Sequence, residues 1–223
     1  MGAHLKICGL TQPLQAAAVA GLGVNAIGVI AVERSARFLP VAQRAALWQA
    51  VAAADPTVLR VLVLVNPSDD QLNELEGGCG HQLLQLHGEE SPERCRQLQR
   101  QLGLPVWKAL RVRGPEDLEQ ASRYSGCVDA LLLDAWSAAQ HGGTGERLPL
   151  QWLQRFSPDL PWWLAGGIGP ENAVSVLEAL AVAGLQPTGL DASSSVEYAP
   201  GDKDVAAVAR LVAAVRGWTQ QNP

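Results

Sequence analysis

Residues 82–110 read QLLQLHGEESPERCRQLQRQLGLPVWKAL, and they contain one complete strand–helix–strand unit. The first and last five residues are short apolar runs of the kind that form strands. Between them, Ser91, Pro92 and Glu93 place a hydroxyl, a proline and an acid in order, which predicts the start of a helix over 91–102. Two strands joined by a helix are expected to lie parallel in one sheet.

The same alternation runs from one end of the chain to the other. Strands are predicted at 4–8, 25–30, 59–65, 82–86, 106–110, 129–133, 162–165 and 188–191. Helices are predicted near 13–22, 41–54, 69–76, 91–102, 115–124, 150–156, 170–183 and 203–217. Eight strand–helix units in 223 residues predict an α/β fold, a (β/α)8 TIM barrel that forms a single domain over 1–223. The alternative is a doubly wound open sheet, but it needs fewer strands, and no GxGxxG follows the first strand.

Composition and charge exclude several classes of function. The net charge of −5 gives no basic surplus for a nucleic acid or an anionic membrane, and no apolar run approaches the ~18 residues of a membrane span. The four cysteines show no CxxC and no metal-ligand spacing, so we expect reduced thiols and no metal. Because no signal peptide is evident, we expect a cytoplasmic protein. The sequence carries no signal for the oligomeric state.

Side-chain alternation along the strands predicts which residues face the interior of the barrel. In the first strand, Lys6 and Cys8 share one face with His4, and Leu5 and Ile7 share the other. In the same way His87 follows the fourth strand and Asp134 the sixth, each opposite a row of leucines. Because the apolar faces must pack against the helices, the polar faces point inward. Barrel enzymes carry their catalytic residues at the carboxyl ends of the strands, so this pattern predicts an active site.

Cys8 and Asp134 are the predicted catalytic residues. Cys8 ends the first strand, and the ammonium group of Lys6 is expected to lower the pKa of its thiol toward neutrality. Asp134 follows three leucines, where partial burial is expected to raise its pKa so that it can donate a proton. The alternatives are a buried apolar cysteine and a capping aspartate. A base and an acid on different sides of one cavity suit an isomerisation.

Three loops rich in Gly or Ser follow the late strands: HGGTG (141–145), AGGIG (165–169) and DASSS (191–195). Glycines let backbone N–H groups approach an anion, and the loops after strands 7 and 8 are where barrels commonly hold phosphate, so we expect a phosphorylated small-molecule partner. The fork of Arg37 could hold a carboxylate, and His87 is expected to hydrogen-bond in the interior. The residues predicted to bind the substrate are Arg37, His87, Gly143, Gly166, Gly167, Asp191, Ser193 and Ser194.

These residues lie in six segments: KICGLT (6–11), QLHGEESPERC (85–95), LLLDAW (131–136), GGTG (142–145), LAGGIGPENA (164–173) and DASSSVE (191–197). Together the segments resemble the phosphoribosylanthranilate isomerase family of tryptophan biosynthesis. The resemblance implies a (β/α)8 barrel that converts N-(5-phosphoribosyl)anthranilate by an Amadori rearrangement without metal or cofactor. It also implies that Cys8 is the general base, that Asp134 is the general acid, and that Arg37 meets the anthranilate carboxylate. The phosphate site would comprise Gly166, Gly167, Asp191, Ser193 and Ser194.

The chain departs from the family pattern at three places. Ser195 stands where glycine is usual, Glu146 stands where lysine is common, and GVIAVE in the second-strand region lacks an aromatic residue. Two other functions stay open at this point. One is a related isomerase of histidine biosynthesis, alone or as a dual-substrate enzyme, although its doubly phosphorylated substrate would need a second anion loop in the first half of the barrel. The other is a non-catalytic barrel that binds a phosphorylated metabolite.

Overall fold

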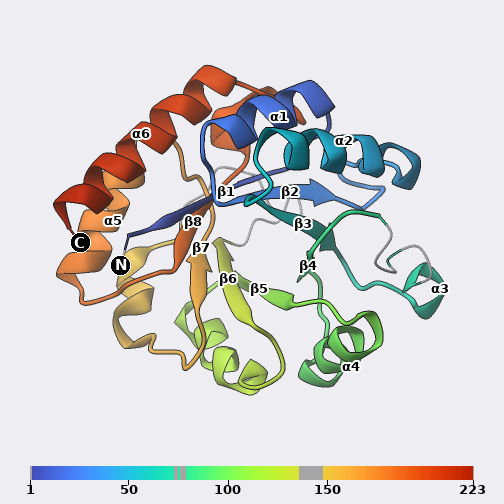
Figure 1. Ribbon diagram of the computed structural model, residues 1–223. Helices are drawn as coiled ribbons and strands as arrows, with labels where there is room; N and C mark the ends of the chain where they lie inside the picture. Colours follow the sequence, from blue (N-terminus) through green and yellow to red (C-terminus); the bar gives the residue numbers. More distant parts are fainter. Residues whose placement is uncertain (1, 73–74, 76–78, 136–147, 223) are drawn as a thin grey trace.

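A closed barrel of eight parallel strands forms the centre of the molecule (Figure 1). The computed structural model describes residues 2–72, 75, 79–135 and 148–222. The strands are β1 (His4–Cys8), β2 (Ala26–Ile30), β3 (Leu59–Leu64), β4 (Leu83–Leu86), β5 (Val106–Val112), β6 (Ala130–Ala135), β7 (Trp162–Leu164) and β8 (Gly189–Ala192). Each strand pairs with the next, and β8 pairs with β1. This closure confirms the predicted TIM barrel and excludes the open sheet.

Helical segments surround the barrel (Figure 1). The α-helices are α1 (Pro13–Gly21), α2 (Val41–Ala54), α3 (Asp69–Leu72), α4 (Pro92–Leu102), α5 (Ala173–Val182) and α6 (Val205–Gln221). The 3-10 helices are η1 (Pro115–Tyr124), η2 (Leu150–Arg155) and η3 (Ser194–Val196). The helical segments expected at 115–124 and 150–156 are 3-10 helices, because polar and apolar periodicity predicts a helical turn without distinguishing i+3 from i+4 hydrogen bonds.

The boundaries of α4 follow from its sequence. Ser91 Oγ accepts a hydrogen bond from the Arg94 N–H at 3.2 Å, and Pro92 occupies the first turn, where its missing N–H has no cost. At the other end Gly103 adopts a φ of 62°, a left-handed conformation that glycine adopts freely and that ends the helix. The helix start predicted from Ser91, Pro92 and Glu93 is confirmed.

The apolar residues form two layers, as the strand alternation predicts. The outward faces of the strands, such as Leu5 and Ile7 of β1, belong to the large core shared with the helices. The inward faces form a smaller cluster that includes Leu132, and there the indole rings of Trp107 and Trp163 lie 4.8 Å apart. The large residues Trp107, Leu132 and Trp163 of this cluster pack together inside the barrel, whereas Cys8, Val63 and Ala165 of the same cluster line a cavity.

A short hairpin, β9 (Glu197–Ala199) and β10 (Asp202–Lys203), follows β8 and was not predicted. Strands of three and two residues are too short to produce a periodic sequence pattern. The hairpin rests on the loop after β1, where Thr11 Oγ1 donates to the Gly201 carbonyl at 2.8 Å. It therefore connects the last barrel strand to the first loop of the chain.

Within the described ranges, no helix is long and apolar enough to cross a membrane.

Candidate active site

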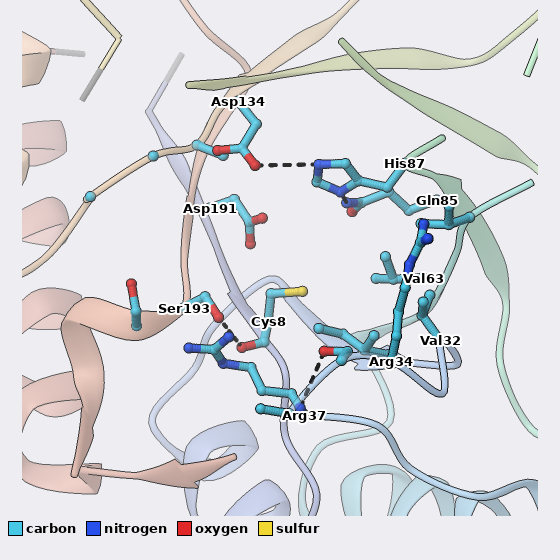
Figure 2. A pocket seen from close by; sticks show the side chains of 18 residues that line it. Cys8, Val32, Arg34, Arg37, Val63, Gln85, His87, Asp134, Asp191 and Ser193 are labelled. Carbon is cyan, nitrogen blue, oxygen red and sulfur yellow. Dashed lines mark hydrogen bonds and ion pairs between the residues drawn. The ribbon is translucent and has the colours of Figure 1, made fainter. Parts of the chain in front are cut away.

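A cavity of about 360 Å³ opens at the carboxyl ends of the strands (Figure 2). Every predicted site residue that the structure describes lines this cavity: Cys8, Arg37, His87, Asp134, Gly166, Gly167, Asp191, Ser193 and Ser194. Gly143, with the rest of the loop 141–145, lies outside the described residues, as does Glu146. The strand alternation and the common direction of the strands thus place residues that are far apart in sequence around one space.

A buried ion pair lies beside Cys8 and corrects the expectation for its thiol. Lys6 Nζ donates to Asp191 Oδ1 at 2.9 Å, and Lys6 is fully buried. Burial raises the pKa of the Cys8 thiol; Lys6 and Lys203 oppose this effect, whereas Asp191 adds to it. The predicted lowering toward neutrality was wrong, because burial outweighs the ammonium group and Asp191 compensates much of its charge.

Asp191 occupies the predicted place in the cavity wall but offers no donor to a phosphate. Its carboxylate accepts from Lys6, and burial raises its pKa, with Lys6 opposing the shift. A phosphate group is bound by donors such as backbone N–H groups, so a carboxylate contributes none of the required hydrogen bonds. Asp191 is therefore the ion-pair partner of Lys6, and its charge influences the pKa of Cys8.

Gly28 of β2 provides the space for Cys8 and Lys6. A Cβ atom at this position would lie 2.7 Å from Cys8 Sγ and 3.2 Å from Lys6 Nζ. The thiol and the ammonium group therefore both pack against a bare Cα atom. Gly28 was not among the predicted site residues, although a glycine inside a predicted strand is itself a sign of close approach by another group.

On the other side of the cavity, His87 lies between Gln85 and Asp134. His87 Nε2 is 3.3 Å from Asp134 Oδ2, and Gln85 Nε2 donates to His87 Nδ1 at 3.2 Å (Figure 2). Gln85 therefore occupies Nδ1, and Nε2 is the ring nitrogen that faces Asp134. The contact between Nε2 and Asp134 lacks the angle of a hydrogen bond, and Nε2 remains able to bind a ligand.

The glycines after β7 form a turn in the left-handed region. Gly166 and Gly167 have φ values of 96° and 62°, which favour glycine. Asn172 fixes the turn, because its Nδ2 donates to the Gly167 carbonyl at 2.7 Å and its Oδ1 accepts from the Gly169 N–H at 3.0 Å. A Cβ at Gly169 would lie only 2.8 Å from the Cβ of Ser195. Because Gly169 has no side chain, it leaves room for Ser195, which stands where glycine is usual in the family.

Arg37 holds a carboxylate of its own chain. Its Nε lies 3.0 Å from both carboxylate oxygens of Glu197, and its Nη2 lies 2.8 Å from Oε2. Burial would raise the pKa of Glu197, but Arg37 and Lys203 together hold it below its ordinary value. Sequence reasoning predicted that Arg37 meets a carboxylate but missed Glu197, whose only signal was its position after the serine-rich segment 191–195.

Comparison with known proteins identifies the family. The family of N-(5′-phosphoribosyl)anthranilate (PRA) isomerase matches residues 5–214. The chain belongs to this family. It is 46% identical over 209 residues to N-(5′-phosphoribosyl)anthranilate isomerase of Trichormus variabilis, with 93% of this chain and 96% of the relative covered. The Synechocystis enzyme of the same name is also 46% identical, with 95% and 94% covered.

Solved structures of PRA isomerases share the fold. The Thermus thermophilus enzyme superposes with a TM-score of 0.79 at 32% identity, covering 96% of this chain and 98% of that one. A PRA isomerase solved with reduced 1-(o-carboxyphenylamino)-1-deoxyribulose 5-phosphate superposes with a TM-score of 0.76 at 28% identity, covering 96% and 99%. The resemblance drawn from the six sequence segments is therefore confirmed as family membership.

Proposed function

We propose that the protein converts N-(5-phosphoribosyl)anthranilate into 1-(2-carboxyphenylamino)-1-deoxyribulose 5-phosphate, an isomerisation of tryptophan biosynthesis. The observation that carries this proposal is one cavity that is lined both by a thiol, Cys8 of β1, and by a carboxyl group, Asp134 of β6. Family membership supports the same reaction, and a PRA isomerase has been solved with a reduced form of this product. We expect the enzyme to act in the cytoplasm.

The lining of the cavity suggests how the substrate lies. The phosphate group fits the turn at Gly166–Gly167 and the start of η3 at Ser193–Ser194, where backbone N–H groups can approach it closely. On the opposite side the wall is apolar and suits an aromatic ring; it comprises Ile30, Val32, Val63 and Val65. The sugar then spans the space between Cys8 and Asp134. Because the substrate is held at both ends, its reacting carbons need little further orientation.

Acid catalysis by Asp134 opens the sugar ring. Protonated Asp134 donates to the ring oxygen while the bond from that oxygen to C1′ breaks, and the anthranilate nitrogen supplies the electron pair that forms a Schiff base. His87 Nε2 lies 3.3 Å from Asp134 Oδ2, so it can help to hold the carboxyl group in place. The products of this step are an open-chain iminium ion and the Asp134 carboxylate.

Base catalysis by Cys8 completes the rearrangement. The Cys8 thiolate removes the proton from C2′, and the electron pair of that C–H bond forms an enolamine that ketonises to the product. The raised pKa of the thiol disfavours the thiolate in the empty cavity. The positive charge of the iminium ion counteracts this effect, because an opposite charge nearby favours the ionised form. Each group is expected to contribute ~10²–10⁴-fold to the rate.

A turnover assay tests the proposal. The protein is incubated with N-(5-phosphoribosyl)anthranilate, and the loss of its anthranilate fluorescence is followed, with Cys8→Ser as the inactive control. A parallel reaction contains the doubly phosphorylated aminoaldose of histidine biosynthesis. We expect turnover of the first substrate only. Turnover of the second substrate alone, or of neither, would refute the proposal, and turnover of both would assign the dual-substrate function.

A further inference from the structure

Three buried charged groups meet at the cavity wall: Glu197, Arg37 and Lys203. Their side chains are 3%, 7% and 0% exposed. Glu197 receives the Nε and Nη2 atoms of Arg37 on one side and the Nζ atom of Lys203 on the other, and its Oε1 also accepts from the Gly201 N–H at 3.2 Å. Several donors hold this carboxylate, and it in turn holds the edge of the Arg37 fork that is formed by Nε and Nη2.

Lys203 extends this network to the reaction centre. Its Nζ donates to the Cys8 carbonyl at 2.6 Å and to the Ser193 carbonyl at 3.2 Å. Ser193 Oγ also donates to the Cys8 carbonyl, at 3.1 Å. Glu197 therefore connects three parts of the site: it contacts Arg37 directly, and through Lys203 it reaches the end of β1 and the proposed phosphate loop after β8.

The contacts of Arg37 leave part of its guanidinium for a ligand. Glu197 binds Nε and Nη2, while Arg37 still lines the cavity and lies beside Cys8 and Ser193 (Figure 2). Gly9 makes room for the side chain, since a Cβ there would lie 2.5 Å from Arg37 Cδ. Because a guanidinium group is planar and rigid, fixing one edge determines where the remaining Nη1 group points.

The charges of the network favour an anion in the cavity. One carboxylate faces two cations, Arg37 and Lys203, so the three groups together carry a net positive charge. Buried cations are stabilised by nearby negative charge. The proposed substrate carries two anionic groups, the phosphate and the anthranilate carboxylate, and the phosphate has its own loops at Gly166–Gly167 and Ser193–Ser194.

We propose that Glu197 is a positioning residue that holds Arg37 so that its free edge receives the carboxylate of the substrate. This inference rests on the proposed function. Glu197 touches no reacting atom in this scheme; it acts through Arg37 on the binding of the aromatic acid. The hairpin formed by β9 and β10, which carries Glu197 and Lys203, is then the element that adapts the site to a carboxylate-bearing substrate.

The test compares two substrates, N-(5-phosphoribosyl)anthranilate and N-(5-phosphoribosyl)aniline, which lacks the carboxylate. For Glu197→Gln we expect the KM for the first substrate to rise on the order of 10- to 100-fold, the range of one charge-assisted hydrogen bond, with little change in kcat. We expect its KM for the aniline substrate to change much less, because that substrate has no carboxylate for Arg37 to receive. Because both residues act as one unit, Glu197→Gln combined with Arg37→Met should be no worse than Arg37→Met alone. Glu197→Asp, which keeps the charge, should restore part of the loss.

Asp129→Asn is the matched control for the loss of a structural carboxylate. Asp129 Oδ2 accepts from the Val106 N–H at 2.7 Å, at the start of β5 and away from the cavity. Its substitution should lower thermal stability without changing either KM. A Glu197→Gln effect that is equal for both substrates, or that adds to the effect of Arg37→Met, would overturn the inference. If the wild type fails to turn over the first substrate, the proposed function itself is wrong; if only the Glu197 effect is missing, the inference alone fails.

Discussion

Lys6 and Asp191 form an ion pair with a 2.9 Å contact inside the barrel, and Lys6 shares the inward face of β1 with Cys8. Both charges act on the thiol in opposite directions: Lys6 lowers the pKa of Cys8 and Asp191 raises it, while burial is the largest effect and raises it. The net effect of the ion pair is therefore to limit the rise in the pKa of Cys8 that burial alone would cause.

Lys6→Met should raise the pKa of Cys8 further. The substitution removes the larger of the two opposing charge effects, and Asp191, whose pKa is already raised by burial, is expected to become protonated without its partner. The rate of alkylation of Cys8 by iodoacetamide, measured against pH, should shift to more alkaline pH than in the wild type. Cys8→Ser gives the background from the other cysteines. An unchanged or more acidic profile would show that Lys6 does not act on the thiol.

Glu197 should contribute a pH dependence to folding stability. Its pKa is lowered in the folded protein relative to an ordinary value of about 4.5, so the unfolded state binds the proton more readily. Its contribution is then fully present above pH ~4.5 and is lost as the pH falls through the folded pKa. In urea denaturation between pH 7 and 3, the wild type should lose more stability than Glu197→Gln. Parallel curves for the two proteins would contradict this prediction.

Gly28→Ala should inactivate the enzyme by displacing the thiol. The added methyl group would lie 2.7 Å from Cys8 Sγ, closer than real contacts allow, and within 3.2 Å of Lys6 Nζ. Repacking of this kind typically costs about 1–3 kcal/mol of stability, whereas a misplaced base should lower kcat by roughly 100-fold. Gly21→Ala is the control, because a Cβ at Gly21 meets nothing within 4 Å. Normal kcat in Gly28→Ala would mean that the thiol position is not critical.

Period-two alternation along strands explains why so much of the site was predictable. It places Cys8 and Asp134 on inward faces, and closure of the barrel then brings them to one cavity, although they are more than a hundred residues apart in sequence. Gly28 is different, because a missing side chain matters only through the neighbours that come close to it. These neighbours, Cys8 and Lys6, are known only once the register of β1 and β2 is known.

The electrostatic properties of the site were the least predictable. A lysine two residues from a cysteine predicts a lower thiol pKa, but the pairing of Lys6 with Asp191, 185 residues away in sequence, and the depth of burial decide the sign. The partner of Arg37 is likewise set by the unpredicted hairpin that carries Glu197. Strand periodicity reports which face a residue occupies, and it carries no information on which charges meet there.

If backbone N–H groups bind the phosphate, as proposed, Gly167→Val should raise KM more than Ser194→Ala does. A valine at φ 62° costs about 1–2 kcal/mol in strain and keeps the phosphate away from the backbone. Ser194→Ala removes at most one hydrogen bond to a charged group, ~1.5–3 kcal/mol, which bounds its effect on KM. Competitive inhibition by inorganic phosphate measures the same site independently.

Gly103→Val controls for the backbone strain in this comparison. Gly103 ends α4 with the same φ of 62°, and a Cβ there meets nothing within 4 Å. It should lower stability about as much as Gly167→Val while leaving KM and the inhibition by phosphate unchanged. Equal effects of Gly167→Val and Ser194→Ala on phosphate inhibition would instead assign the binding to side chains.

The last prediction separates the two catalytic steps by a kinetic isotope effect. Cys8→Ser replaces the thiol with a hydroxyl group that does not ionise near neutral pH, so proton removal from C2′ should limit the rate, and kcat should fall by ~10²–10⁴-fold. A substrate deuterated at C2′ should then show a large primary isotope effect. Asp134→Asn keeps the shape of the side chain but cannot donate a carboxylic proton, so ring opening should limit the rate and the isotope effect should be close to one.

The double variant and the binding controls complete this test. Because the acid and the base serve successive steps of one reaction, the double variant should be little slower than the slower single variant. All three proteins should still be inhibited by inorganic phosphate, because the phosphate loops are intact. Equal isotope effects in Cys8→Ser and Asp134→Asn would mean that the two groups do not divide the steps in this way. If Cys8→Ser kept the wild-type kcat, the base would be another group, and His87, whose Nε2 lies 3.3 Å from Asp134, would be the next residue to substitute.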